Sequence, residues 1–145
     1  VLVEDFVEFL ERHDMPIPDA LRGVASPSIL IVDDEMPVAK SIQRVARRAG
    51  FDSYIATGGF QAGIMLSQYE PKVMTLDLSM PGMDGYSVIE FTRDQSKYKD
   101  LKIVVISALD DISLERALEI GADATLQKPF SNQIKTSTRE QFMSM

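Results

Sequence analysis

Short apolar runs alternate with helix-length segments along most of the chain, and this alternation limits its fold more than any other feature. Three of the runs are nearly continuous Val, Ile, Leu and Met, which is typical of parallel strands covered on both faces. Strands that alternate with helices predict repeated βαβ units and a parallel sheet. The runs are "ILIVD" (29–33), "DSYIA" (52–56), "VMTLD" (73–77), "KIVVIS" (102–107) and "ATLQ" (124–127).

The segments between the runs carry apolar residues at the three- and four-residue spacing of helices. The first ends at Gly50 and the last at Gly121, and glycine commonly stops a helix. A closed barrel needs eight strand–helix units, so five strands favour an open, doubly wound sheet. The apolar positions expected on buried helix faces include Val38, Ile42, Val45, Phe60, Ile64, Val88, either Phe91 or Ile89, Ile112, Leu114 and Leu118.

The two ends of the chain differ from its middle. Residues 1–27 include "VEDFVEFLERH" (3–13), which places Phe6, Phe9 and Leu10 on one side of a short amphipathic helix, and continue as a linker rich in Pro, Gly and Ser. Residues 132–145 are polar with few apolar anchors, which predicts a weak or displaced final helix. We therefore expect one globular domain over 28–131 between two appendages.

Composition excludes several classes of function. The net charge is −7, whereas nucleic-acid binding usually needs a basic face. The one dense basic stretch, "RVARR" (44–48), lies in a helix pattern and is interpreted as a solvated face. No apolar run approaches the roughly 18 residues of a membrane span. The chain has no cysteine, so disulfides and thiolate metal sites are excluded, and a cytoplasmic location is expected.

Three acids, a hydroxyl and an amine follow the predicted strands at the edge where open parallel sheets bind ligands. Asp33 and Asp34 end the first strand, Asp77 the third and Ser107 the fourth, while Lys128 follows the fifth. One aspartate at a strand end is usually a turn former or helix cap. Carboxylates brought close together, however, repel one another by an energy on the order of 4 kcal/mol per pair. The cluster therefore predicts raised pKa values or a bound cation, and oxygen ligands suit Mg²⁺.

Four motifs in this order, "ILIVDDE", "VMTLDLSMPGMDG", "VVISA" and "LQKPF", resemble the receiver domain of response regulators in two-component signalling. The resemblance covers residues 28–131. It implies a CheY-like, flavodoxin-like α/β fold with a doubly wound five-stranded parallel sheet in the strand order 2-1-3-4-5, here with an N-terminal helical extension.

The resemblance also implies a role for each residue of the cluster. The aspartate in the place of Asp77 is the phosphoacceptor. Asp34 would ligate Mg²⁺ directly, Asp33 through water, and Ser79 through its backbone carbonyl. The implied partner is a sensor histidine kinase or a phosphotransfer protein, and the phosphotransfer is self-catalysed, so the domain is not expected to be an enzyme with its own substrate. Ser107 and Lys128 would grip the phosphoryl group.

Two positions depart from the family's pattern. Thr125 stands at the switch position, where receivers often carry a Tyr or Phe that swings inward on phosphorylation. The polar final segment falls where a common homodimer face of the family would lie.

The N-terminal segment resembles the tail of an excisionase-like, MerR-type DNA-binding module, which implies a longer protein that binds DNA. The alternative interpretation of this segment is a plain amphipathic helix that packs on the receiver or on a second copy of the chain.

A second function stays open on the sequence alone. A pseudo-receiver would act as a protein-interaction module that never takes phosphate. The intact acidic, hydroxyl and lysine positions argue against it, while Thr125 leaves the downstream switch open.

Overall fold

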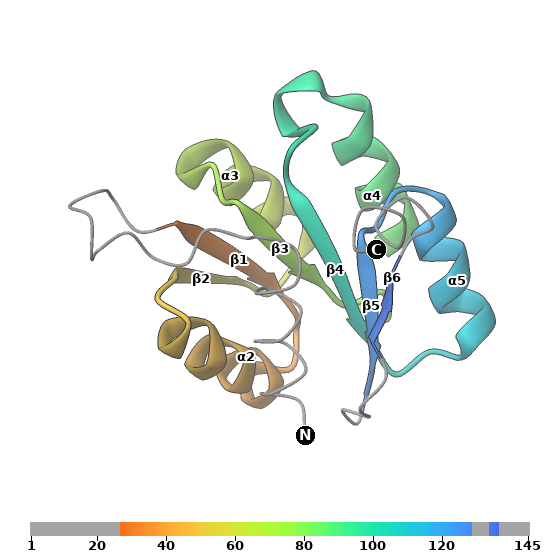
Figure 1. Cartoon of the computed structure of the whole chain (residues 1–145), viewed down its shortest axis with the longest axis horizontal. Coiled ribbons are helices and arrows are strands. Elements are labelled where there is room, and N and C mark those ends of the chain that lie inside the picture. Colours follow the sequence, from red (N-terminus) through yellow and green to blue (C-terminus); the bar gives the residue numbers. More distant parts are fainter. Residues whose placement is uncertain (1–26, 129–133, 137–145) are drawn as a thin grey trace.

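The computed structural model describes residues 27–128 and the backbone of residues 134–136 (Figure 1). Its centre is a single sheet in the order β2-β1-β3-β4-β5-β6. The first five strands are parallel and follow the predicted order 2-1-3-4-5, which confirms the doubly wound fold. The strands are β1 (Ser28–Val32), β2 (Asp52–Ala56), β3 (Val73–Leu76), β4 (Lys102–Ser107), β5 (Ala124–Gln127) and β6 (Ile134–Thr136).

Four α-helices connect the parallel strands. Helix α2 lies on one side of the sheet and the other three lie on the opposite side (Figure 1). Gly50 and Gly121, which follow α2 and α5, both have positive φ angles, as expected for glycines that end helices. The helices are α2 (Met36–Arg48), α3 (Gly59–Tyr69), α4 (Gly85–Asp94) and α5 (Asp111–Glu119), and the short 3₁₀ helix η2 (Ser96–Tyr98) follows α4.

The sheet is buried on both faces because successive side chains of each strand point to opposite sides. In β1, Ile29 and Ile31 join the cluster on the α2 side, while Leu30 and Val32 join the cluster beneath α3, α4 and α5. This alternation explains why the strand sequences are apolar throughout rather than at every second position.

Two helix faces differ from the prediction. Phe60 and Ile64 were expected to be buried, but they are exposed, and Ala62 and Leu66 form the buried side of α3 instead. Both pairs are four residues apart, so spacing alone does not distinguish them. In α5, Ile112 is likewise exposed, whereas Leu114 and Ala117 are buried. In α4, burial falls on Ile89, one of the two predicted alternatives, and Phe91 is exposed.

Residues 134–136 form a strand, where the sequence predicted part of a weak or displaced helix. Strand β6 pairs antiparallel with β5, from Leu126 opposite Ile134 to Ala124 opposite Thr136. The β-branched residues Ile134 and Thr136 favour an extended backbone, and the outer edge of β5 offers free hydrogen-bonding groups. The predicted helix in residues 1–27 and the remainder of 132–145 lie outside the described residues.

Among residues 27–128 and 134–136, no helix has both the length and the apolar character needed to cross a membrane.

Candidate functional site

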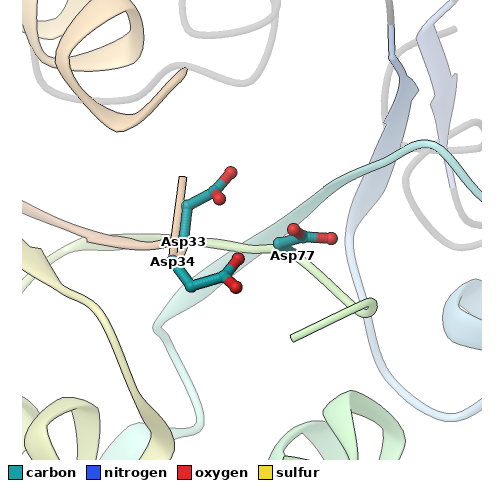
Figure 2. Close-up of side chains that lie close together, drawn as sticks. All are labelled: Asp33, Asp34 and Asp77. Carbon is teal, nitrogen blue, oxygen red and sulfur yellow. The ribbon is translucent and has the colours of Figure 1, made fainter. Parts of the chain in front are cut away.

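The three aspartates predicted from the sequence meet at the carboxyl edge of the sheet. One carboxylate oxygen from each of Asp33, Asp34 and Asp77 lies within 4.8 Å of the others (Figure 2). Parallel pairing produces this meeting, because Val32 and Leu76 are register partners and each is followed directly by its aspartate. The backbone N–H of Asp77 donates to the carbonyl of Val32 at 3.0 Å, which extends the pairing to the site itself.

Asp33 and Asp77 are oriented by the same local device. The Oδ1 atom of Asp33 accepts a hydrogen bond from the backbone N–H of Glu35 at 2.9 Å, and Oδ1 of Asp77 accepts one from Ser79 at 3.0 Å. Such bonds to an N–H two residues on are Asx turns, which hold a short side chain close to its own backbone. Both carboxyls are almost fully buried, whereas Asp34 is exposed. The site therefore has two fixed acids and one acid that faces solvent.

Lys128 lies between the two buried acids. Its Nζ donates to Oδ2 of Asp33 at 2.8 Å and to Oδ2 of Asp77 at 3.4 Å. Burial by itself lowers the pKa of the Lys128 amine, but the hydrogen bond to Asp33 and the negative charges of both acids outweigh it and raise this pKa above its ordinary value. The amine is therefore a cation at neutral pH and partly balances the acidic cluster.

Ser107 lies at the end of β4, fully buried beside the acids. Its Oγ is 3.3 Å from Oγ of Ser79 and accepts a long hydrogen bond of 3.4 Å from the N–H of Leu109. The carbonyl of Ser107 accepts the N–H of Lys128 at 2.8 Å, so pairing between β4 and β5 sets both predicted side chains beside the cluster.

Thr125, at the predicted switch position, lies in the middle of β5 with only 1% of its surface exposed. Its Oγ1 has no hydrogen-bond partner among the residues that the structure describes. The buried Thr125 side chain is thus smaller than the Tyr or Phe that receivers often carry at this position.

One contact beside the site was not predicted. The Gln127 side chain donates from Nε2 to the carbonyl of Leu109 at 2.9 Å, which ties β5 to the loop after Ser107. Gln127 stands next to Lys128 in "LQKPF", but the sequence alone carries no signal for its partner, which is 18 positions away.

The donor set fits a hard divalent cation. Carboxylate oxygens are the ligands that Mg²⁺ prefers, and one exposed acid beside two buried ones leaves room for the water that Mg²⁺ retains. Within the described ranges, Lys128 alone balances the buried acids, and a divalent cation would neutralise the remaining negative charge. The described chain offers no other group of three or more metal-ligating side chains in this arrangement.

The fold and the acidic edge together define a CheY-like receiver. The chain belongs to the response regulator receiver domain family, whose model matches residues 29–137. The family assignment and the strand order therefore confirm the resemblance inferred from the four motifs.

Curated relatives agree with this assignment. The transcriptional regulatory protein PrrA of Mycobacterium tuberculosis is 38% identical over 109 residues, which are 74% of this chain and 46% of PrrA. The PrrA proteins of Mycobacterium bovis and Mycobacterium leprae match to the same extent. The chain thus spans about half the length of these curated relatives.

Solved structures show the same fold. A receiver domain from Bermanella marisrubri is 47% identical with a TM-score of 0.68, over 74% of this chain and 90% of that one. A response regulator from Burkholderia pseudomallei, described with a phosphorylated aspartic acid, a calcium ion and citrate, is 25% identical with a TM-score of 0.66, over 74% of this chain and 62% of that one.

Proposed function

We propose that Asp77 accepts a phosphoryl group and that this modification switches the contacts of the receiver. The observation that carries the proposal is the position of Lys128, whose amine donates to both Asp33 and Asp77 at the edge where three carboxylates meet. Asp77 is a buried carboxylate beside a fixed cation, and such a group is suited to act as a nucleophile toward phosphorus. The phosphorylated aspartic acid described for the Burkholderia pseudomallei regulator supports the same chemistry here.

In the proposed reaction, a carboxylate oxygen of Asp77 attacks the phosphorus of the donor. The bond between phosphorus and the donor's nitrogen or oxygen breaks, and an acyl phosphate forms on Asp77. The Lys128 ammonium offsets negative charge on the phosphoryl oxygens, and the Ser107 hydroxyl donates a hydrogen bond to one of them. The Asx turn to Ser79 keeps the Asp77 side chain from rotating away from the donor.

Asp33, Asp34, Asp77 and the backbone carbonyl of Ser79 would hold Mg²⁺ at this edge. When bound, the ion supplies a further positive charge for the phosphoryl oxygens. Asp33 is held in position by Glu35 and Lys128, so it presents a fixed oxygen, while the exposed Asp34 adjusts to the ion.

The proposed partner is a sensor histidine kinase or a phosphotransfer protein in the cytoplasm, with small phosphodonors as substitutes. Loss of the phosphoryl group to water is self-catalysed, in line with a domain that is not a classical enzyme. The PrrA relatives are transcriptional regulators about twice as long as the matched region. We therefore propose that an output module of the whole protein binds DNA, whereas the receiver itself makes no direct contact with nucleic acid or membrane. We also propose that phosphorylation leads to a homodimer.

The test is the intact mass of the protein after incubation with acetyl phosphate, with and without Mg²⁺. We expect one phosphoryl adduct that requires Mg²⁺ and is absent from Asp77→Asn. The matched control is Asp100→Asn, an exposed aspartate just before the start of β4 and thus at the opposite end of this strand from Ser107, and this variant should be phosphorylated like the unmodified protein.

An adduct on Asp77→Asn would assign the phosphoacceptor to another residue. No adduct under any condition, in protein whose circular dichroism is that of a folded domain, would refute phosphorylation and favour the pseudo-receiver.

A further inference from the structure

Tyr86, the second residue of α4, connects this helix to α5, its neighbour on the same side of the sheet (Figure 1). The Tyr86 hydroxyl donates to the backbone carbonyl of Ser113 at 3.0 Å. The guanidinium of Arg116 lies over the Tyr86 ring, 4.2 Å from its centroid. Ser113 and Arg116 are three positions apart in α5, so they share one face of that helix. Tyr86 therefore holds α5 both by its hydroxyl and by its ring.

The start of α4 also packs directly against the residue that follows Asp77. A Cβ atom added at Gly85 would lie 2.9 Å from Cα of Leu78, so no free space separates the two backbones. Leu78 follows Asp77 directly, and Gly85 directly precedes Tyr86. Because packed groups transmit displacement, a shift of the backbone at Asp77 reaches Tyr86 across this single contact.

The loop between Asp77 and α4 is fastened at both of its ends. At the first end, Oδ1 of Asp77 accepts the backbone N–H of Ser79 at 3.0 Å. At the second end, Oδ1 of Asp84 accepts the backbone N–H of Tyr86, and Oδ2 accepts the hydroxyl of Ser87, each at 3.0 Å. The loop is thus tied to the phosphoacceptor candidate at one end and to the first turn of α4 at the other.

The other side chains between the site and α5 make weaker connections to that helix in the described part of the chain. The buried Oγ1 of Thr125 has no hydrogen-bond partner there. Gln127 donates to the carbonyl of Leu109, and Oγ of Ser107 accepts a long bond of 3.4 Å from the N–H of Leu109. Leu109 belongs to the loop before α5, whereas Tyr86 contacts the helix itself.

We propose that Tyr86 holds α5 in the unphosphorylated receiver and releases it when Asp77 is phosphorylated. This inference rests on the phosphorylation of Asp77 proposed above. A phosphoryl group on the Asp77 carboxylate adds volume and negative charge beside the N–H of Ser79, so the start of the loop has to adjust. The Tyr86 hydroxyl lies 3.0 Å from its acceptor, and a shift of the first turn of α4 by about 0.5–1 Å takes it out of hydrogen-bonding range. Tyr86 is therefore a positioning residue that couples the site to α5.

The test measures amide hydrogen exchange in α5 of the full chain by mass spectrometry, before and after phosphorylation with acetyl phosphate and Mg²⁺. The intact mass of each sample gives the extent of phosphorylation. In the unmodified protein, exchange in α5 should rise about fivefold on phosphorylation, which is the effect of losing one hydrogen bond between the helices. Asp77→Asn, treated in the same way, should show no rise.

Tyr86→Phe keeps the ring over which Arg116 lies but lacks the hydroxyl. This variant should be phosphorylated to the same extent as the unmodified protein, because Tyr86 does not touch the acidic site. Exchange in α5 should already be faster by about fivefold without phosphorylation and should not rise further with it. The matched control is Tyr98→Phe, at another half-buried tyrosine, in η2, which should behave as the unmodified protein in both states.

A purely structural role of Tyr86 predicts a different result. Exchange in α5 of Tyr86→Phe would then be faster by the same factor in both states, and the rise on phosphorylation would remain. That result, or the absence of any rise in a phosphorylated unmodified protein, would overturn the coupling and leave the proposed function intact. If the unmodified protein forms no phosphoryl adduct, the proposed function and the coupling both fail.

Discussion

Thr125 carries a buried hydroxyl group that has no hydrogen-bond partner in the described part of the chain. Such a group loses its bonds to water without replacement, at a cost of about 1–3 kcal/mol. We expect Thr125→Val, which replaces the hydroxyl with a methyl of similar size, to raise the free energy of unfolding by about 1 kcal/mol. The measurement is the urea midpoint at constant m-value.

The matched control is Thr92→Val. Thr92 is equally buried, but its Oγ1 donates to the carbonyl of Val88 at 2.6 Å. This variant should lower the free energy of unfolding by about 1 kcal/mol. If both variants shift the urea midpoint in the same direction, the missing hydrogen-bond partner of the Thr125 hydroxyl does not determine the effect on stability.

Lys128 is a residue through which alkaline pH should act on the stability of the fold. Its amine has a raised pKa because Asp33 and Asp77 accept its hydrogen bonds and attract its charge, an effect larger than the opposing effect of burial. A raised pKa in the folded state stabilises the fold fully below the ordinary value of 10.5, and this contribution is lost as pH rises through the folded-state pKa.

We therefore expect Lys128→Met to be less stable than the unmodified protein at neutral pH, with a difference that narrows above the ordinary pKa of 10.5. Urea unfolding in EDTA, followed from neutral to strongly alkaline pH, measures it. For the control Lys99→Met, at an exposed lysine, the difference in stability from the unmodified protein should not narrow as the pH rises. A constant difference at every pH would contradict the proposed contribution of the charge.

At the scale of helices and loops, Gly85 allows α4 to begin close to the segment that carries Asp77. A Cβ atom at Gly85 would lie 2.6 Å from Cδ2 and 2.9 Å from Cα of Leu78. We expect Gly85→Ala to lower the free energy of unfolding by about 1–3 kcal/mol, because the backbone after Asp77 would have to shift. Phosphorylation of Asp77 should also slow. Thermal unfolding measures the loss of stability, and the acetyl phosphate assay measures the rate of phosphorylation.

Gly63 is the matched control for this substitution. It lies inside α3, is exposed, and has no atom within 4 Å of the added Cβ. Gly63→Ala should raise the free energy of unfolding by about 0.5–1 kcal/mol, since alanine favours the helix. Equal effects of the two substitutions would show that helix propensity, rather than the close approach to Leu78, determines the outcome at Gly85.

The elements show how far sequence reasoning reaches. Strands were predictable because a strand buried on both faces is apolar throughout, and β2, β4 and β5 have the bounds of their apolar runs. The convergence of Asp33, Asp34 and Asp77 followed from the geometry of parallel sheets. The buried side of α3 did not follow, because Phe60 and Leu66 both suit a buried position and only packing decides between them. Contacts between residues far apart in sequence gave no local signal.

At the scale of the whole domain, Arg93 joins three segments at the edge opposite the acidic site. Its guanidinium donates to the carbonyls of Gly121 and Leu101, each at 2.8 Å, and to the carboxylate of Asp123 at 2.6 Å. Asp123 also accepts the N–H of Ile103 at 2.8 Å. One side chain therefore holds the end of α4 to the starts of β4 and β5.

We expect Arg93→Ala to lower the free energy of unfolding by about 3 kcal/mol, because it removes the guanidinium that donates to the buried carboxylate of Asp123 and to the carbonyls of Gly121 and Leu101. Arg93→Lys keeps the charge but cannot reach three acceptors, so its loss should be intermediate. Urea unfolding measures both. Mg²⁺ affinity, measured by calorimetry in native buffer, should not change, and a large change would mean that the two edges of the sheet are coupled.

Strand β6 has a consequence for how copies of the domain associate. It covers the outer edge of β5, so the described sheet ends in β2, five residues long, on one side and in β6, three residues long, on the other. A very short edge strand offers few backbone groups to a second chain. In the language of polymer chemistry, β6 acts as a chain stopper, because the edge that it presents is too short to favour growth of the sheet on that side.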